Sequence, residues 1–420
     1  MMLRSRNAGL LPLSCMMLFA SVACSGRSSV PMPQQPVQSG TANWSMDGAD
    51  LYNTRRSQYI GPLLATLVEK RSYPAGSVLG RPLGDSSGNI LLDYTFAIPS
   101  DAPAFESEAI PASPSMLLLD GLKELRRHSE FGETQLGKVA GSDGASYLMM
   151  SNGLYGYLPV WPFSRDKTGE ERVVHAIGPD GVVLWHAFLD ITANGRMKTT
   201  PQGNLLVFYK YGELSMLSPS GGNLGTADTG METDFEPAFL HENVLVTAGF
   251  SQSGQIQAFD LELGKMWEYQ LEGAVANSPV VAVDNSIRFC SASGYLHCLA
   301  PDGKLRWRIE LGTGSFRDMA LAVDGTCIVP LDNSLFAVSP EGELAWHRDI
   351  GDGQLASPAV DKDGNIYTAG PDSGIICLTG EGNELWKLGP DDESGDWQLA
   401  LIRPGELFLT QGSRAILVKD

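Results

Sequence analysis

A repeat of about forty residues organises this chain. In each copy a turn centred on glycine follows an apolar strand and leads into another short strand, and the clearest copies, at residues 181–185, 303–307, 342–346 and 382–386, end at tryptophan. Weaker copies begin at Gly121, Gly221 and Gly264, and after a first interval of 60 residues the turns recur every 39 to 43 residues. A fixed period of this size, filled by strands, is typical of a β-propeller or a β-solenoid.

A second hairpin inside each repeat favours the propeller. Upstream of each glycine turn, Asp-Gly or Asn-containing turns separate two apolar runs, as at residues 282–287, 322–326 and 360–366. Such turns supply the positive φ that tight hairpins need, so each repeat is predicted to be a four-stranded antiparallel blade with strands A to D. Counting the A–B hairpins gives an all-β, eight-bladed β-propeller. Seven blades remain the alternative if the divergent first repeat lies on the surface and does not form a blade.

The last blade lacks a strand of its own. Only seven C–D turns are present, because the chain stops at Asp420 directly after the expected strand C. Residues 64–73 precede the first strand A and belong to no earlier hairpin, so we expect them to supply the missing strand D. The ring would then be closed by an N-terminal strand and would leave no open array edge.

The repeats resemble a known family. The pattern of Ala300-Pro-Asp-Gly-Lys-Leu-Arg-Trp307, and the Ser278-Pro-Val-Val281 run that opens a strand A, are similar to the pyrroloquinoline-quinone (PQQ)-type propeller repeat. Trp44-Ser-Met-Asp-Gly, followed by Asn53-Thr-Arg-Arg-Ser57 and Gly61-Pro62, resembles the lead-in of many such proteins. The resemblance covers residues 43–420 and implies a fold, but one fold hosts many activities.

The N-terminus predicts export. Arg4 and Arg6 precede an apolar stretch that ends in Ser21-Val-Ala-Cys24, as in a secretory signal, and the stretch is short for a membrane span. Cys24 resembles the acylated cysteine of a bacterial lipobox, although Ser21 departs from the usual leucine. We expect a lipoprotein signal peptide at 1–23, a flexible tether at 24–42 and the propeller at 43–420. Ordinary cleavage that leaves Cys24 free is the alternative.

The net charge of the chain limits the classes of partner that it can bind. Removal of the signal peptide takes away two arginines and no acids, so the formal net charge moves from −19 to −21. Such an acidic chain is not expected to bind nucleic acid or anionic headgroups.

Cys290 and Cys298 flank Gly294 symmetrically in the B–C hairpin of blade five, which predicts either a cross-strand disulfide or two buried thiols.

No catalytic or metal-binding motif emerges. A PQQ-dependent dehydrogenase is the first enzyme that the resemblance suggests, but the adjacent cysteines common in those enzymes are absent. The six histidines show no ligand spacing, and there is neither a nucleophile elbow nor a phosphate-binding loop. Asp361 and Asp363 hint at a calcium loop, but a hairpin turn explains them better. We expect no catalytic residue, no metal and no cofactor.

The tryptophans have two expected roles. Those at the ends of the repeat, from Trp185 to Trp386, are predicted to pack between blades rather than to stack on a ligand. Trp397 opens strand A of blade eight, and we expect it near the mouth of the central channel together with Glu236, Arg317 and Asp318.

Two insertions interrupt the repeat. They occupy residues 98–114 in blade one and 155–169 in blade two, both between strands B and C, so both should emerge on one face. They contain candidate partner-binding aromatics, namely Phe105, Tyr155, Tyr157, Trp161 and Phe163. The alternative is that the loops have only varied in length without gaining a function, and that these aromatic rings pack onto the edge of their own blade.

The sequence thus predicts a non-enzymatic, lipid-anchored propeller. The anchor and the fold together resemble the PQQ-like lipoproteins of outer-membrane β-barrel assembly, which implies a protein-binding scaffold at the outer membrane facing the periplasm. Its partners would be the membrane, through the lipid, and another envelope protein. The alternative function is a quinoprotein, or another small-ligand binder, that uses the central channel.

Overall fold

The computed structural model describes residues 48–50, 52–74, 77–85, 87–96, 115–128, 135–140, 145–151, 172–178, 182–189, 195–209, 211–240, 243–249, 254–390 and 395–420. All of them belong to one compact unit, Gln34–Asp420. In this part of the chain no helix has the length and apolar character needed to cross a membrane.

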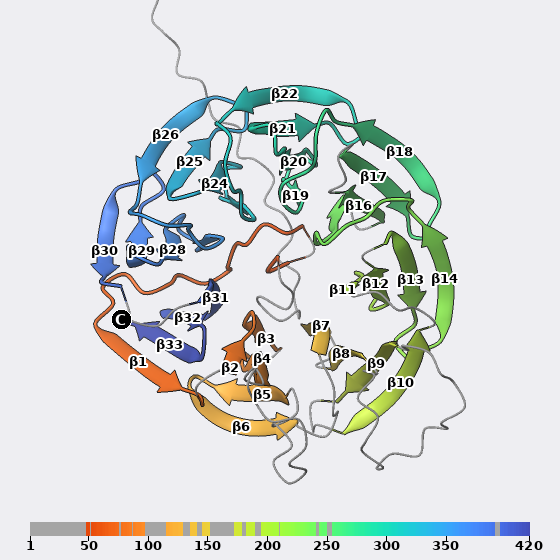
Figure 1. The fold of residues 1–420 in the computed structure, drawn as a ribbon, viewed down its shortest axis with the longest axis horizontal. Helices are drawn as coiled ribbons and strands as arrows, with labels where there is room; N and C mark the ends of the chain where they lie inside the picture. Colours follow the sequence, from red (N-terminus) through yellow and green to blue (C-terminus); the bar gives the residue numbers. More distant parts are fainter. Residues whose placement is uncertain are drawn as a thin grey trace, which may run out of the picture. The chain divides into compact units, whose positions relative to one another are not determined.

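The strands form eight sheets arranged as a β-propeller (Figure 1). Each sheet is an antiparallel meander whose strand A lies nearest the central axis and whose strand D lies on the outside. The predicted fold class and the count of eight blades are therefore confirmed.

The first four blades use the first half of the chain. Their strands, in the order A to D, are: blade one, β2 (Ser77–Leu79) with β3 (Leu83–Gly84), β4 (Ile90–Phe96), β5 (Ser115–Asp120) and β6 (Lys123–His128); blade two, β7 (Gln135–Ala140), β8 (Ser146–Ser151), β9 (Arg172–Ile177) and β10 (Val183–Leu189); blade three, β11 (Gly195–Thr199), β12 (Leu205–Tyr209), β13 (Glu213–Leu217) and β14 (Asn223–Asp228); blade four, β15 (Ala238–Leu240), β16 (Val244–Gly249), β17 (Gln255–Asp260) and β18 (Lys265–Gln270).

The last four blades follow the same order. They are: blade five, β19 (Val280–Val281), β20 (Ile287–Cys290), β21 (Tyr295–Leu299) and β22 (Leu305–Glu310); blade six, β23 (Ala320–Leu321), β24 (Cys327–Leu331), β25 (Ser334–Val338) and β26 (Leu344–Asp349); blade seven, β27 (Ala359–Val360), β28 (Ile366–Gly370), β29 (Gly374–Leu378) and β30 (Glu384–Leu388); blade eight, β31 (Trp397–Arg403), β32 (Glu406–Gln411), β33 (Arg414–Lys419) and, as strand D, β1 (Leu67–Ser72).

The N-terminal strand closes the ring as the sequence predicts. β1 pairs antiparallel with β33, with Leu67 opposite Lys419 and Ser72 opposite Arg414. The carboxylate of Asp420 accepts hydrogen bonds from the backbone N–H groups of Leu63 and Leu64 at 2.6 and 2.9 Å. The two ends of the chain are thus joined in one blade.

The core lies between the blades. Strands B and C are buried along their length, as in β12, β20 and β29, whereas the outer strands β14, β18, β22 and β26 alternate between exposed and partly buried positions. One hydrophobic cluster joins blades four and five, a second joins blades five and six, and a third joins blades six and seven. Each blade therefore buries apolar surface on both faces, which is the main source of stability for a closed ring of sheets.

The repeated tryptophans fasten neighbouring blades. Trp307 of blade five donates a hydrogen bond from Nε1 to the carbonyl oxygen of Pro340 in blade six, at 3.0 Å. A Cβ added to Gly342, whose φ is +88°, would lie 2.6 Å from the Trp307 ring. Glycine is therefore required at this turn both for its backbone conformation and for the contact with tryptophan. The prediction that the tryptophans pack between blades agrees with this geometry.

The same contact recurs around the ring. Nε1 donates from Trp185 to the carbonyl oxygen of Pro219, from Trp346 to that of Gly380, and from Trp386 to that of Pro62. In the last of these the segment that leads into β1 replaces the missing C–D turn.

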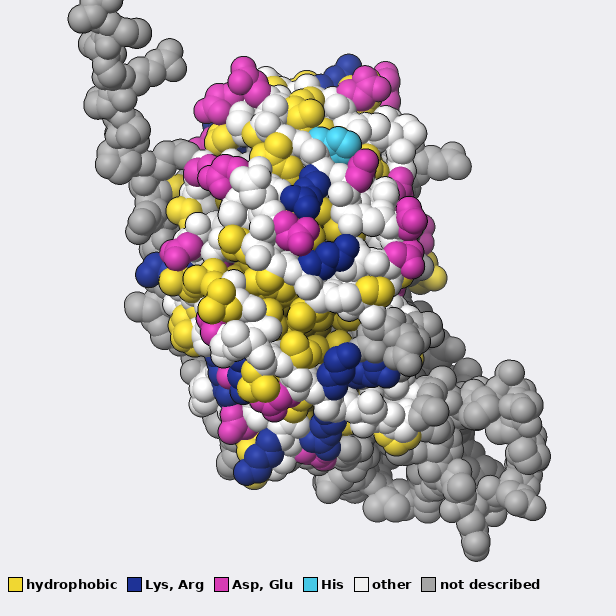
Figure 2. Space-filling model, turned by 90° about the vertical axis from the view of Figure 1, so that its left-hand side faces the viewer, with side chains coloured by type: hydrophobic (Ala, Val, Ile, Leu, Met, Phe, Trp, Pro, Cys, Tyr) yellow, Lys and Arg dark blue, Asp and Glu magenta, His cyan; other side chains and the backbone are white. Residues whose placement is uncertain are grey.

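The outside of the ring carries scattered apolar side chains. Figure 2 faces the side that includes β26, β30 and β1, and hydrophobic groups gather there among charged ones. Leu344, Leu385, Leu64 and Leu67 are exposed large hydrophobic residues of these strands and of the segment before β1.

Candidate functional site

The chain's own N-terminal segment fills the centre of the ring. Residues 52–62 run from the axis towards the rim between blades seven and eight (Figure 1). Their carbonyl oxygens accept hydrogen bonds from backbone N–H groups of strands A. Val281 donates to Tyr52 at 2.9 Å, Leu321 to Thr54 at 2.8 Å and Val360 to Arg55 at 3.0 Å. We call residues 52–62 the central segment.

Asn53 anchors the central segment to blades four and five. Its side-chain amide donates to the carbonyl oxygens of Glu236, Pro237 and Pro279 at 3.0, 3.1 and 2.9 Å. Its carboxamide oxygen accepts from Lys198, which is fully buried and also donates to the Pro237 carbonyl oxygen at 2.8 Å. Because a buried ammonium group is costly unless hydrogen-bonded, Asn53 and Lys198 depend on each other.

Arg55 makes the corresponding contacts on the other side of the axis. The guanidinium group, 3% exposed, donates through Nε to the carbonyl oxygen of Pro358 at 2.8 Å and through Nη2 to that of Leu399 at 3.4 Å. Ser57 donates from its hydroxyl group to the carbonyl oxygen of Leu401 at 3.0 Å. These contacts reach blades seven and eight.

Proline at the start of strands A explains why carbonyl groups are available there. Pro237, Pro279 and Pro358 directly precede the strands A of their blades, where proline lacks an N–H to pair but leaves an acceptor. Polar side chains of the central segment satisfy these acceptors. The Ser-Pro runs that the sequence places at the start of strand A thus form part of the central binding surface.

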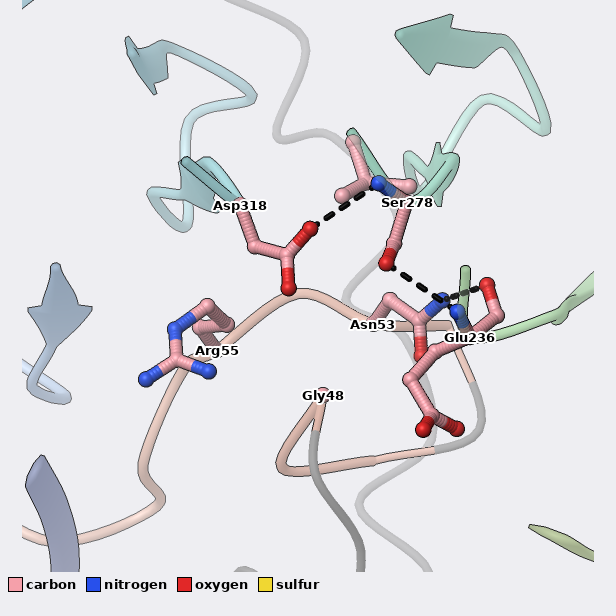
Figure 3. Close-up of a pocket in the computed structure, with 7 residues that line it drawn as sticks. Gly48, Asn53, Arg55, Glu236, Ser278 and Asp318 are labelled. Atoms are coloured by element: carbon pink, nitrogen blue, oxygen red, sulfur yellow. Dashed lines mark hydrogen bonds between the residues drawn. The ribbon is translucent and has the colours of Figure 1, made fainter. Parts of the chain in front are cut away.

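A small pocket lies against the central segment (Figure 3). It has a volume of about 180 Å³ and is lined by Gly48, Asn53, Arg55, Glu236, Ser278, Val280 and Asp318. Ser278 accepts through its hydroxyl oxygen from the Glu236 N–H at 3.1 Å and donates its own N–H to the Asp318 carboxylate at 2.9 Å. Ligand pockets usually measure about 300 to 1,000 Å³, so this space is small for an organic cofactor.

Two of the four residues expected at the channel mouth line this pocket. Glu236 also lies 3.6 Å from Arg196, and Asp318 lies 4.0 Å from Arg81 of blade one. Arg317 instead contacts Asp396 at 3.2 Å. Each of these three residues thus lies within 4.0 Å of a side chain of opposite charge.

Trp397 does not line this pocket. It begins β31 as predicted, but its side chain is 5% exposed and belongs to the hydrophobic cluster between blades seven, eight and one. Its indole N–H has no hydrogen-bond partner among the described residues. The large apolar ring is buried in the core, so it does not line the pocket.

The two insertions share a face with this mouth. Residues 97–114 connect β4 to β5 and residues 152–171 connect β8 to β9, so both join strand B to strand C. In an antiparallel meander the B–C connections and the starts of strands A lie on the same face, which we call the B–C face. Phe105, Tyr155, Tyr157, Trp161 and Phe163 lie outside the described residues.

The cysteine geometry differs from the expectation. Cys290 lies opposite Leu296 and Cys298 lies opposite Arg288, so the two cysteines are offset along the hairpin instead of facing each other. Both are free thiols, and burial raises the pKa of each. The cross-strand disulfide is therefore not formed in this structure. The pairing of the two strands is centred one residue before Gly294, so Cys290 and Cys298 are not opposite each other.

The acidic turn of blade seven is satisfied by the protein itself. One Asp361 oxygen accepts from the backbone N–H groups of Asp363 and Asn365, both at 2.9 Å. The other accepts from the Gly61 N–H and the Tyr367 hydroxyl group, both at 3.1 Å. These bonds make Asp361 a hairpin residue that also holds the central segment. Among the described side chains no three His, Cys, Asp or Glu residues gather as a metal-binding group.

Comparisons with known proteins agree with the fold. The family model described as outer membrane protein assembly factor BamB matches residues 170–322 and 252–389. The structure is similar to BamB from Moraxella catarrhalis, with a TM-score of 0.55 and 13% identity over 74% of this chain and 95% of that one. It is also similar to the quinohemoprotein alcohol dehydrogenase from Comamonas testosteroni, with a TM-score of 0.62 and 10% identity over 90% and 81% of the two chains. Sequence comparison with curated proteins finds no match.

Proposed function

Because this chain belongs to the family of the outer membrane protein assembly factor BamB, we propose that it is a non-enzymatic, protein-binding scaffold of the cell envelope. It would be held by a lipid on Cys24 at the outer membrane, face the periplasm, and take part in the assembly of outer-membrane proteins. Its partner would be another envelope protein.

The occupation of the channel by the chain itself carries this proposal. In a propeller that binds a cofactor on its axis, strands A surround the ligand. Here Asn53 and Arg55 take that place and use their side-chain donors on strand-A carbonyl groups. The pocket described beside them, of about 180 Å³ including its open side, is too small for PQQ, a fused tricycle with three carboxyl groups. Binding at the periphery is therefore favoured over chemistry at the centre.

The B–C face is the proposed partner surface. The insertions emerge from neighbouring blades at the same strand junction, and they concentrate aromatic residues and proline. Aromatic anchors often dominate the energy of an interface. We propose Phe105, Tyr155, Tyr157, Trp161 and Phe163 as those anchors.

A triple substitution tests the partner surface. Replacing Tyr157, Trp161 and Phe163 together with Ala in the full chain should abolish recovery of crosslinked partners from membranes, since each truncated hot-spot residue costs about 2 kcal/mol or more. The melting temperature should stay near that of the wild type. A matched control replaces the exposed outer-strand residues Leu305, Leu344 and Leu385 with Ala and should leave recovery intact.

Two results would contradict the proposed surface. Recovery equal to that of the wild type would show that the three aromatics are not an interface, and a large fall in melting temperature would identify them as core. The rival function is tested separately by titrating PQQ with Ca²⁺ in the absorbance spectrum. A saturable spectral shift with dehydrogenase activity would establish the quinoprotein alternative.

A further inference from the structure

Two histidines face each other in blade two. His175 on β9 and His186 on β10 are direct cross-strand partners, one register step from the Trp185–Ala176 pair. Their ring centroids are 6.4 Å apart, and the ring planes are inclined by 50°. The two residues are eleven positions apart in the sequence, so only the pairing of strands C and D brings them together.

This pair is not a feature of the repeat. The C–D pair at the same register step is different in the five blades that follow: Ser215–Thr226, Gln257–Glu268, His297–Arg308, Phe336–His347 and Ile376–Lys387. A single histidine is accommodated there in blades five and six. Blade folding therefore does not require two imidazoles at this position.

The environment suits a ligand role. His186 is exposed to solvent, and Phe188 contacts its ring edge-on at 5.4 Å between centroids. His175 is partly buried. A histidine side chain can bind a metal ion through one of its two ring nitrogens.

The ring separation is close to that of a bidentate imidazole site. Zinc binds imidazole nitrogen at about 2.0 to 2.1 Å, which places the centroids of two rings on one tetrahedral ion about 5 Å apart. The observed 6.4 Å is about 1.4 Å longer, so binding would have to draw the exposed His186 ring towards His175. A tetrahedral ion would keep two positions for water.

We propose that His175 and His186 form a surface site for one divalent transition-metal ion of the zinc and copper class. Imidazole selects these ions over Mg²⁺ and Ca²⁺, which prefer oxygen ligands. The bound ion clamps strands C and D of the blade that carries the 155–169 insertion. This site is independent of the proposed partner surface and of the lipid anchor.

Metal titration of the full chain without a histidine tag tests the site. Zn²⁺ and Cu²⁺ are titrated by calorimetry with millimolar Mg²⁺ present, because Mg²⁺ occupies the carboxylate sites of so acidic a protein. We expect one saturable ion per chain and a raised melting temperature on binding, since a ligand specific for the folded state stabilises it. His186→Ala and His175→Gln should each weaken binding by about tenfold or more, because even the loss of an outer partner of a metal ligand costs 10–100-fold.

His347→Ala is the matched control, since His347 holds the same register position on strand D of blade six and is also exposed. It should bind like the wild type. The imidazole proton resonances of His175 and His186 should shift or broaden on titration, and those of His297 should not. Saturable binding that survives both blade-two substitutions, binding weakened equally by His347→Ala, or the absence of saturable binding would each overturn the proposal.

Discussion

Two residues of the central segment have positive φ values, which residues other than glycine rarely adopt. Asn53 and Arg55 have φ values of +58° and +49°. Left-handed backbone costs roughly 1–2 kcal/mol for a non-glycine residue, least for asparagine. The Asp50 carboxylate accepts from the N–H groups of Tyr52 and Thr54 at 2.9 and 3.0 Å and so helps to fix the turn. Gly48 packs closely against Asn53, because a Cβ added at Gly48 would lie 2.2 Å from the Asn53 side-chain oxygen.

Asn53 is the residue at which this geometry can be tested. Asn53→Ala should lower the free energy of unfolding by about 3–5 kcal/mol, because it removes the amide donors and takes a partner from the buried Lys198. Asn53→Gly loses the same side chain but relieves the backbone, so it should be about 1 kcal/mol less destabilising than Ala. Urea unfolding followed by tryptophan fluorescence measures both. Wild-type stability in either variant would show that the central segment is dispensable.

At the scale of the elements, contacts from outer strands to the next blade tie the blades together, as in β10, β22, β26 and β30. At the last junction no tryptophan is available, since Glu69 occupies the third position of β1. Arg71 of β1 instead donates to the carbonyl oxygen of Leu122 and to the Glu124 carboxylate, at 2.9 and 2.8 Å. The N-terminal segment therefore contacts Trp386 through Pro62, just before β1, and blade one through Arg71 of β1.

Deleting residues 60–75 tests the closure by β1. The deletion leaves β33 with an unpaired edge and removes the seat of Trp386, so we expect aggregation or the loss of a single cooperative melting transition. Deletion of the tether, residues 25–42, is the control, since it removes no described strand, and it should melt like the wild type. Calorimetry and light scattering report both effects. A soluble deletion of 60–75 with unchanged melting would refute closure by this strand.

At the scale of the whole molecule, attachment of a lipid to Cys24 would determine where in the cell envelope the propeller acts. The ring itself offers an acidic body with its channel filled, and the stretch that ends at Cys24 is the part of the sequence that predicts a membrane contact. A lipoprotein's several acyl chains anchor stably, whereas one chain anchors weakly.

Cys24→Ser tests the anchor. The thiol is the group that would be acylated, so the variant should fail to incorporate a labelled fatty acid and should leave the precursor unprocessed at this site. Metabolic labelling followed by membrane fractionation measures both. Because residue 24 precedes the first described strand by more than forty positions in the sequence, the propeller should melt as in the wild type. Label that persists in Cys24→Ser would rule out acylation at this residue.

The sequence by itself determined the ring. Turn glycines, Asp-Gly hairpins and terminal tryptophans are local signals that recur with a fixed period, so eight blades, the closing strand at residues 64–73 and the B–C position of the insertions were all predictable. The lead-in from Asn53 to Ser57 was visible as part of the resemblance, but nothing local showed that it fills the channel.

Only the tertiary structure decided the contacts that depend on which strands meet. Asn53 bonds to Pro279, 226 positions away, because the ring brings blades four and five to the axis. His175 and His186 become partners through the register of β9 and β10, and a hairpin centred one residue away from Gly294 separates Cys290 from Cys298. Trp397 is buried since blades seven and one enclose it. Periodicity fixes the number and order of strands, but closure of the ring and the register between strands set which side chains touch, and these emerge only when the whole circle is assembled.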